Sequence, residues 1–135
     1  MRISIFNASV LLACICFAPT QVSAASASYI CAIGEVYECT PVTGCKRAAL
    51  QDIKLSPFIM FDAEKKQLTS AAVGEEVRTE EIEGISTTDK FIFLHGTQDV
   101  ETWNAVISLE DGRLSGGISN ATSSFAIFGN CTPKP

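Results

Sequence analysis

Short apolar runs separated by turn residues recur along the chain after its first two dozen residues, a pattern typical of antiparallel β-structure. The alternation is clearest over residues 102–109, where Trp103, Ala105, Ile107 and Leu109 occupy every second position. Asp111-Gly112 follows and suits a type I′ turn, because Gly tolerates positive φ. Residues 114–119 are therefore expected to return as the partner strand, with Gly116-Gly117 marking a bulge or close packing.

Strands are also predicted at residues 29–37, 58–61, 67–73, 75–85, 91–94 and 125–128. The run 91–94 is apolar at every position, which indicates a strand covered on both faces. Residues 46–55 are ambiguous, because Leu50 and Ile53 could share one face of a short helix that ends before Pro57. We expect an all-β fold, a small antiparallel meander barrel or sandwich of seven to nine strands, and favour the barrel because closure covers the sheet edges.

The first 24 residues have the three parts of a secretory signal peptide. Arg2 provides a basic start, residues 3–18 are mainly apolar, and Val22-Ser23-Ala24 puts small residues where signal peptidase requires them. A membrane span fits less well, because it needs about 20 unbroken apolar residues and Pro19 ends a shorter run here. The sequence therefore predicts a signal peptide at residues 1–24 and a single β domain at residues 25–135.

Cys14 offers an alternative, because Leu11-Leu12-Ala13-Cys14 loosely resembles the site at which bacterial lipoproteins are cleaved and acylated. Cleavage there would leave a very short apolar segment before it and would strand Phe17 beyond the lipid. We therefore expect Cys14 and Cys16 to be discarded with the signal peptide.

Four cysteines remain in the mature chain: Cys31, Cys39, Cys45 and Cys131. An even number in a short exported chain indicates two disulfides, whereas a zinc site usually needs closely spaced pairs that these spacers do not supply. Three connectivities are open. We favour Cys39–Cys45, across a turn at residues 40–44, together with Cys31–Cys131, which would join the first strand to the end of the last. The alternative is Cys31–Cys45 with Cys39–Cys131.

The predicted mature chain is acidic. Removing the first 24 of 135 residues leaves 111, and of the charged residues only Arg2 is lost, so that 9 basic and 15 acidic side chains give a net charge of −6. Nucleic acid is excluded as a partner, because its binding depends on Lys and Arg that neutralise phosphates. Docking to an anionic membrane surface is disfavoured for the same reason.

The densest acidic cluster consists of Glu75, Glu76, Glu80, Glu81 and Glu83. We interpret it as a solvated edge strand whose like charges prevent aggregation. The alternatives are a docking face for a basic partner and a weak calcium site, although no loop of regularly spaced Asp residues is present to supply converging oxygens.

No catalytic, cofactor or metal site is predicted. His95, the only histidine, follows an apolar strand and lacks the nucleophile and the orienting partner that a triad requires. One histidine with scattered carboxylates also makes a poor transition-metal site. Trp103 could anchor a partner, yet its apolar same-face neighbours favour the core. The chain is therefore expected not to be an enzyme.

Four features carry a resemblance to known proteins: cysteines soon after the signal peptide, Phe-x-x-Phe-Asp at 58–62, a strand, Asp-Gly turn and strand at 103–118, and Phe-Gly-x-Cys at 128–131. Together they resemble short exported proteins of Gram-negative bacteria that have no assigned activity, which implies periplasmic residence. Tyr29-Ile30-Cys31 is also similar to the early Tyr-x-Cys of periplasmic inhibitors of C-type lysozyme, which are small β-barrels. Those inhibitors carry a Ser-Gly-x-x-Tyr motif. Ser115-Gly116 matches its first two residues, but the Tyr is missing here.

These observations favour a periplasmic or secreted, non-enzymatic binding or interaction module without a cofactor. Its partner would be a protein or a small ligand, and the acidity favours a basic one through electrostatic steering. The alternative is an inhibitor of a hydrolase such as lysozyme or a protease, which would contact its target through a polar loop at residues 87–90 or 120–124. No membrane span is expected in the mature chain.

Export makes a direct prediction about the mass of the protein. The parts of the signal peptide predict cleavage after Ala24, with Ala25 and Ala27 as near alternatives. Intact-mass spectrometry of protein recovered from the periplasm should give the mass of residues 25–135. A full-length or diacylated species would rule this prediction out.

Overall fold

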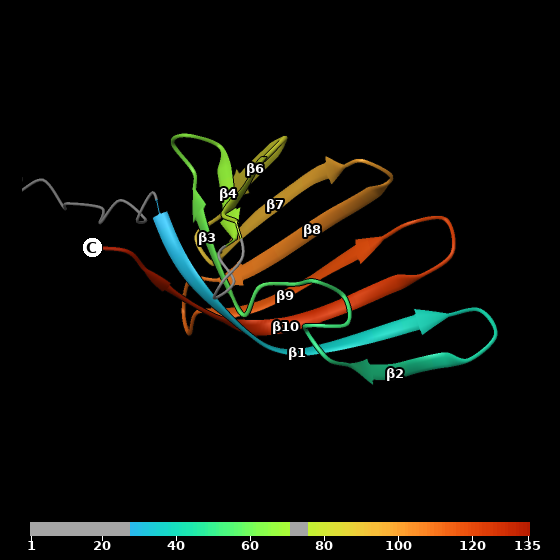
Figure 1. The fold of residues 1–135 in the computed structure, drawn as a ribbon. Coiled ribbons are helices and arrows are strands. Elements are labelled where there is room, and N and C mark those ends of the chain that lie inside the picture. The colour runs from blue at the N-terminus through green and yellow to red at the C-terminus, as the bar shows by residue number, and fades with distance from the viewer. Residues whose placement is uncertain (1–27, 71–75) are drawn as a thin grey trace, which may run out of the picture.

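The computed structural model describes residues 28–70 and 76–135. The predicted signal peptide, its cleavage site and Cys14 lie outside these ranges. The described residues form ten strands and no helix (Figure 1), which confirms the all-β fold. The strands are β1 (Ser28–Thr40), β2 (Gly44–Ala48), β3 (Phe58–Asp62), β4 (Gln67–Ser70), β5 (Arg78–Glu81), β6 (Gly84–Thr87), β7 (Phe91–Gln98), β8 (Glu101–Ser108), β9 (Arg113–Ser119) and β10 (Ser124–Pro133).

All ten strands belong to one antiparallel sheet, in the order β5-β4-β3-β1-β10-β9-β8-β7-β6, with β2 paired to β1 beside this path. The sheet curls into a half-barrel rather than splitting into a sandwich (Figure 1). Two backbone hydrogen bonds bring its outer edges together where β5 passes into β6. Ile82 N donates to Lys66 O at 2.8 Å, and Glu83 N donates to His95 O at 3.0 Å.

The long strand β1 bends at a β-bulge. Its register with β10 shifts between Ile33 and Glu35, so that Gly34 has no opposite residue. Beyond the bend β1 changes one partner: its first part pairs with β3 and its last part with β2, whereas β10 pairs with both parts. The extra residue also leaves both Ile33 and Val36 buried, which strict alternation would not allow.

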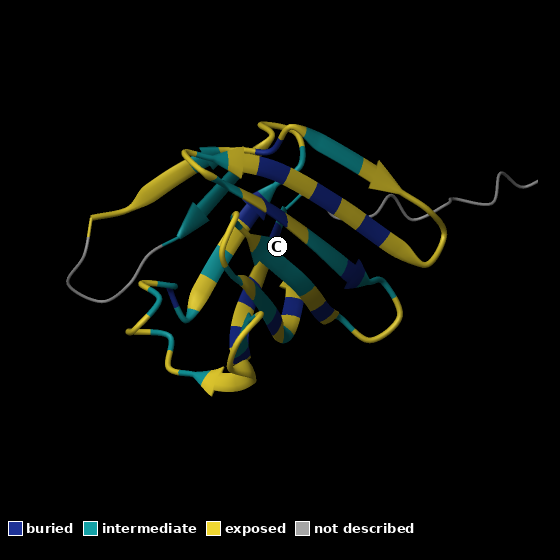
Figure 2. Ribbon diagram, turned by 90° about the vertical axis from the view of Figure 1, so that its right-hand side faces the viewer, coloured by how far each residue is buried: buried dark blue, intermediate teal, exposed yellow. Residues whose placement is uncertain are grey.

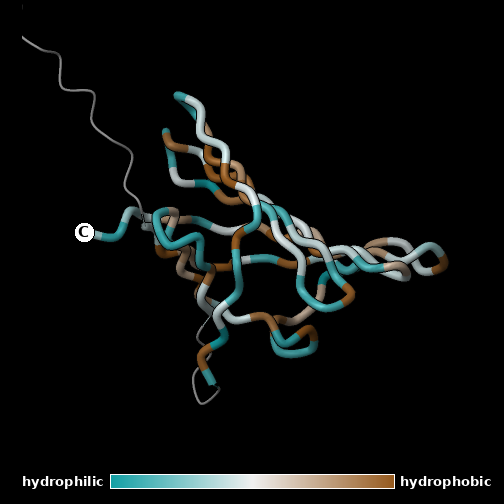
Figure 3. The backbone as a smooth tube through the Cα atoms, turned by 90° about the horizontal axis from the view of Figure 1, so that it is seen from above, coloured by the Kyte–Doolittle hydropathy of each residue, from teal (hydrophilic) through white to brown (hydrophobic). Residues whose placement is uncertain are grey.

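The core consists of the side chains that point to the concave side of the sheet. Buried and exposed residues alternate along the longer strands (Figure 2), and hydrophobic and hydrophilic stretches are mixed along the chain (Figure 3). Ile82, in the joint between β5 and β6, has no exposed surface, and the rings of Tyr29 and Phe61 stack at 4.9 Å. Trp103 is 9% exposed, which confirms its expected place in the core.

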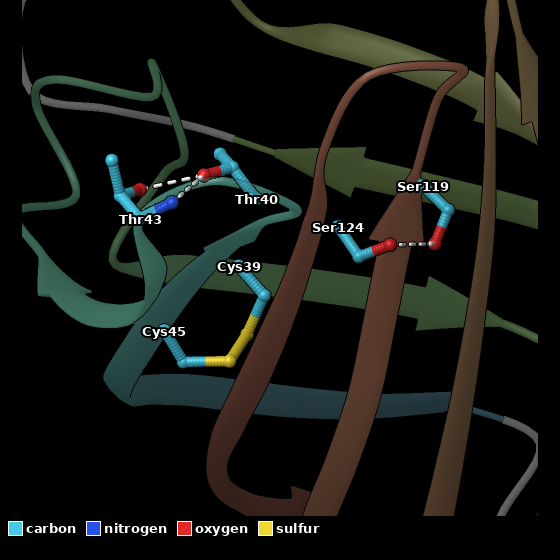
Figure 4. The surroundings of a disulfide bond; sticks show 6 residues. All are labelled: Cys39, Thr40, Thr43, Cys45, Ser119 and Ser124. Atoms are coloured by element: carbon cyan, nitrogen blue, oxygen red, sulfur yellow. Dashed lines mark hydrogen bonds between the residues drawn. A yellow bond between two sulfur atoms is a disulfide. The ribbon is translucent and has the colours of Figure 1, made fainter.

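Two disulfides join β1 to its neighbours, and they have the favoured connectivity. Cys31 and Cys131 are opposite each other in the β1–β10 ladder, and Cys39 and Cys45 are opposite each other in the β1–β2 hairpin. Cys131 lies within β10 rather than after it. At the tip of the β1–β2 hairpin, Thr43 N donates to Thr40 Oγ1, and the two hydroxyls lie 2.6 Å apart (Figure 4).

Residues 91–94 were expected to be covered on both faces, which is wrong. Phe91 and Phe93 are each 40% exposed on the convex face, whereas Ile92 and Leu94 are buried. The apolar run therefore belongs to a strand that is covered on one face only. The structure places His95 in the middle of β7 rather than at a strand end.

Three other expectations differ in detail. Residues 46–55 form the end of β2 followed by turns, not a helix. The predicted strand at 75–85 is two strands, because the chain crosses between the sheet edges at Ile82. These two differences raise the count from the expected seven to nine strands to ten. The turn at Asp111-Gly112 is not of type I′, because only Gly112 has positive φ, at 73°.

The two disulfides are expected to contribute unequally to stability. Cys31–Cys131 closes a loop with a sequence separation of 100 and Cys39–Cys45 one of 6. In the chain-entropy model, closing the long loop stabilises the folded state by about 4.7 kcal/mol and closing the short one by roughly 2 kcal/mol. Replacing Cys31 and Cys131 with Ala should therefore lower the free energy of unfolding, measured in urea, by about twice as much as replacing Cys39 and Cys45. Equal losses would contradict this account.

Candidate functional site

A cavity of about 180 Å³ opens on the concave side of the half-barrel. Strands from both arms of the sheet contribute to its walls, since β3 to β5 lie on one side of the β1–β10 pair and β9 and β8 on the other. Its apolar wall includes Trp103 and the aliphatic side chains of Ile33, Ile59, Leu68, Leu114, Ile118 and Ile127. An apolar hollow of this kind is the usual form of a small-molecule site.

Small residues at two paired positions explain why this part of the interior is not filled. Ala105 of β8 and Gly116 of β9 are opposite each other, and both line the cavity. A Cβ on Gly116 would lie 2.5 Å from Asn104 O, so only glycine fits at position 116, and the side chain of Ala105 faces the open space. This observation confirms the close packing expected at Gly116-Gly117, and no bulge interrupts the register there.

The indole of Trp103 forms part of the cavity wall and rests on β7. It lies over Gly96, its partner in the β7–β8 ladder, because a Cβ on that glycine would come within 2.7 Å of the ring. Its Nε1 is buried and has no hydrogen-bond partner among the described residues. A buried donor without an acceptor costs about 1–3 kcal/mol. A water or a ligand oxygen that accepted this hydrogen bond would recover that energy.

Polar side chains surround the mouth of the cavity. Arg78 and Glu80 come from β5, Gln98 and Glu101 from the β7–β8 hairpin, and Lys54 from the loop after β2. Glu101 Oε1 accepts a hydrogen bond from Asn120 Nδ2 at 3.2 Å, which fixes it against the β9–β10 turn.

The surroundings of Glu80 at this mouth change its pKa. Its side chain is half-buried, and loss of hydration raises its pKa above the ordinary value. The nearby charge of Arg78 lowers the pKa of Glu80, whereas Asp99 and Glu101 raise it further. The interaction with Asp99 and Glu101 indicates that β5 faces the β7–β8 hairpin across the opening.

The acidic cluster predicted from the sequence is divided by the structure. β5 is an edge strand, as expected, and Glu81 is exposed on it. Glu80 alternates to the other face and lines the cavity, so the solvated-face interpretation is wrong for this residue. Glu83 accepts hydrogen bonds from Thr97 N and Thr97 Oγ1. Glu75 lies outside the described residues. Within residues 28–70 and 76–135, no group of three or more His, Cys, Asp or Glu gathers to hold a metal ion.

The remaining candidates from the sequence lie away from the cavity. The side chain of His95 is exposed and covers Gly84 of the neighbouring strand β6. The loop after β9 is ordered by Asn120 Oδ1, which accepts hydrogen bonds from the backbone N and the hydroxyl of both Thr122 and Ser123. Beside this loop, Ser119 and Ser124 hydrogen-bond across the hairpin (Figure 4).

No family model matches the chain, and no curated protein matches it either. In the described part of the chain, no helix is long and apolar enough to cross a membrane. The geometry of the cavity is therefore the main guide to function.

Sequence reasoning missed the cavity and the two carboxyls at its mouth. Its only local signs were the small residues Ala105 and Gly116 on inward-facing positions of adjacent predicted strands. The sequence could not show whether Glu80 or Glu81 faces the interior. The answer depends on where the four-residue strand β5 starts, because successive residues point to opposite faces.

The packing of the indole on β7 predicts the effect of a single methyl group. Gly96→Ala would place a Cβ within 2.7 Å of the Trp103 ring, so we expect a loss of about 1–3 kcal/mol in the free energy of unfolding. Trp103 is the only tryptophan, and its emission should shift as the ring moves. In the control Gly34→Ala, the nearest atom is 3.8 Å from the new Cβ, and the change should stay within about 0.5 kcal/mol. Equal effects of the two changes would refute the contact.

Proposed function

We propose that this protein is an exported, non-enzymatic binding protein that takes a small, mainly apolar ligand into the cavity of its half-barrel. The cavity itself is the observation that carries this proposal. Its volume of about 180 Å³ is close to that of an engineered cavity of roughly 150 Å³ that binds benzene. The ligand group that enters it is therefore about the size of one aromatic ring.

The position of the cavity supports a binding role. Its walls come from strands of both arms of the sheet, so the shape is set by the fold and not by one loop. A preformed hollow spends little free energy on ordering when the ligand binds. The ring of Trp103 belongs to the same wall, so its emission can report on binding there.

The two disulfides support the exported location. Such bonds persist in oxidising compartments such as the bacterial periplasm, and here they connect the first strand to both of its later neighbours. Together with the signal-peptide pattern of residues 1–24, they favour a periplasmic or secreted protein.

An uncharged one-ring probe tests this function. Toluene should cause a saturable change in Trp103 emission and raise the unfolding temperature, because a ligand that binds only the folded state stabilises it. Ala105→Leu fills the cavity and should abolish both effects while leaving the protein as stable or more so. Val106→Leu, which changes the next residue of β8 on the convex side, is the matched control and should bind toluene normally.

Absence of any saturable effect of toluene on the unsubstituted protein would reject the proposed function. Binding that survives Ala105→Leu would place the ligand elsewhere and would reject this cavity. The alternative role, inhibition of a hydrolase through a polar loop such as residues 87–90 or 120–124, predicts that Ala105→Leu leaves complex formation with the hydrolase unchanged.

A further inference from the structure

The cavity is apolar inside but has two half-buried carboxyl groups at its mouth. Glu80 reaches it from β5 and Glu101 from β8, so the two acids belong to opposite sides of the opening. Among the described residues, neither acid forms a salt bridge. Glu101 accepts one hydrogen bond, from Asn120 Nδ2, and neither half-buried acid has a cation within salt-bridge distance among the described residues.

The electrostatics of Glu80 agree with that description. Burial and the charges of Asp99 and Glu101 raise its pKa, and the opposing effect of Arg78 does not cancel them. A positive group placed between Glu80 and Glu101 would reduce the repulsion between the two carboxylates and replace part of the hydration that each has lost.

Two cations also line the cavity, and their surroundings differ from those of the acids. The side chains of Lys54 and Arg78 belong to exposed residues. Because a charge in water retains its hydration, these cations gain little from an anionic ligand. The acids are the less hydrated charges at the mouth, and the net charge of the chain is −5. A cation would therefore be attracted to this opening both locally and at longer range.

We propose that the ligand is a small organic ammonium compound, whose apolar group of about one ring fills the cavity and whose positive nitrogen lies between Glu80 and Glu101. This inference rests on the proposed function, because it assigns the ligand class of the same cavity. Trp103 lines the same cavity, and its buried Nε1 has no hydrogen-bond partner among the described residues.

Three probes of nearly equal size and different charge test the ligand class. They are 2-phenylethylammonium, uncharged 2-phenylethanol and anionic 3-phenylpropanoate. The full chain is expressed with residues 1–27 in place, recovered after processing by the host, and titrated with each probe at neutral pH and low salt while Trp103 emission is recorded. We expect the ammonium to bind at least about tenfold more tightly than the carboxylate, and this ratio to fall at 0.5 M salt.

Single substitutions locate the charge that causes the preference. Glu80→Gln and Glu101→Gln should each weaken binding of 2-phenylethylammonium by about three- to tenfold and change binding of 2-phenylethanol by less than twofold. Glu81→Gln is the matched control, because it removes the same charge from β5 on the side facing away from the cavity. It should leave the affinity for the ammonium within twofold.

The outcomes separate this inference from the proposed function. If 2-phenylethanol and toluene bind but the carboxylate binds as tightly as the ammonium, the cavity is a ligand site and the ammonium class is wrong. The class is also wrong if Glu81→Gln weakens ammonium binding as much as Glu80→Gln, because only the net charge would then matter. If none of the probes binds, the proposed function itself fails. The ranking of the three probes on the unsubstituted protein needs no variant to fold.

Discussion

Pairing between the first and last strands holds the two arms of the sheet together. β1 and β10 form the longest ladder in the structure, and every other strand is connected to it through a chain of neighbours. Because β1 bends at Gly34, it can pair with β3 before the bend and with β2 after it while remaining on β10 throughout. Without this ladder β3 to β5 would be separated from β6 to β9, and neither arm alone has a second apolar layer to cover it.

The cavity follows from the same curvature. A strongly curled sheet brings inward-facing side chains of distant strands together, and large ones fill the interior where Ile82, Tyr29 and Phe61 lie. Where Ala105 and Gly116 replace large residues, the strands come close and the space in front of them remains open. The hollow is thus produced by two small residues on neighbouring strands. Its polar mouth is formed by β5, the β7–β8 hairpin and the loop after β2.

The sequence predicted what depends on local pattern. Alternation over residues 102–109 placed Trp103 inside correctly, and the turn expected at residues 40–44 indicated a hairpin that Cys39 and Cys45 could close. It failed where the answer depends on distant strands. Phe91 and Phe93 are apolar but face outwards, and within residues 28–70 and 76–135 no second layer covers the convex face of β7. Whether Glu80 or Glu81 faced the interior depended on a register with β4 that no local feature of the sequence determines.

The central position of the β1–β10 ladder also sets the order in which the fold can form in time. Residues that pair across this ladder are far apart in sequence, Cys31 and Cys131 being separated by 100 positions, and contacts of such high order form slowly. As the chain emerges from its N-terminal end, β1 and β2 can form their hairpin and join Cys39 to Cys45 early. The native partner of Cys31 becomes available only when nearly the whole chain has appeared. Early closure of the small hairpin removes Cys39 and Cys45 as wrong partners for Cys31 during that interval, and so leaves Cys131 as its remaining partner among the four.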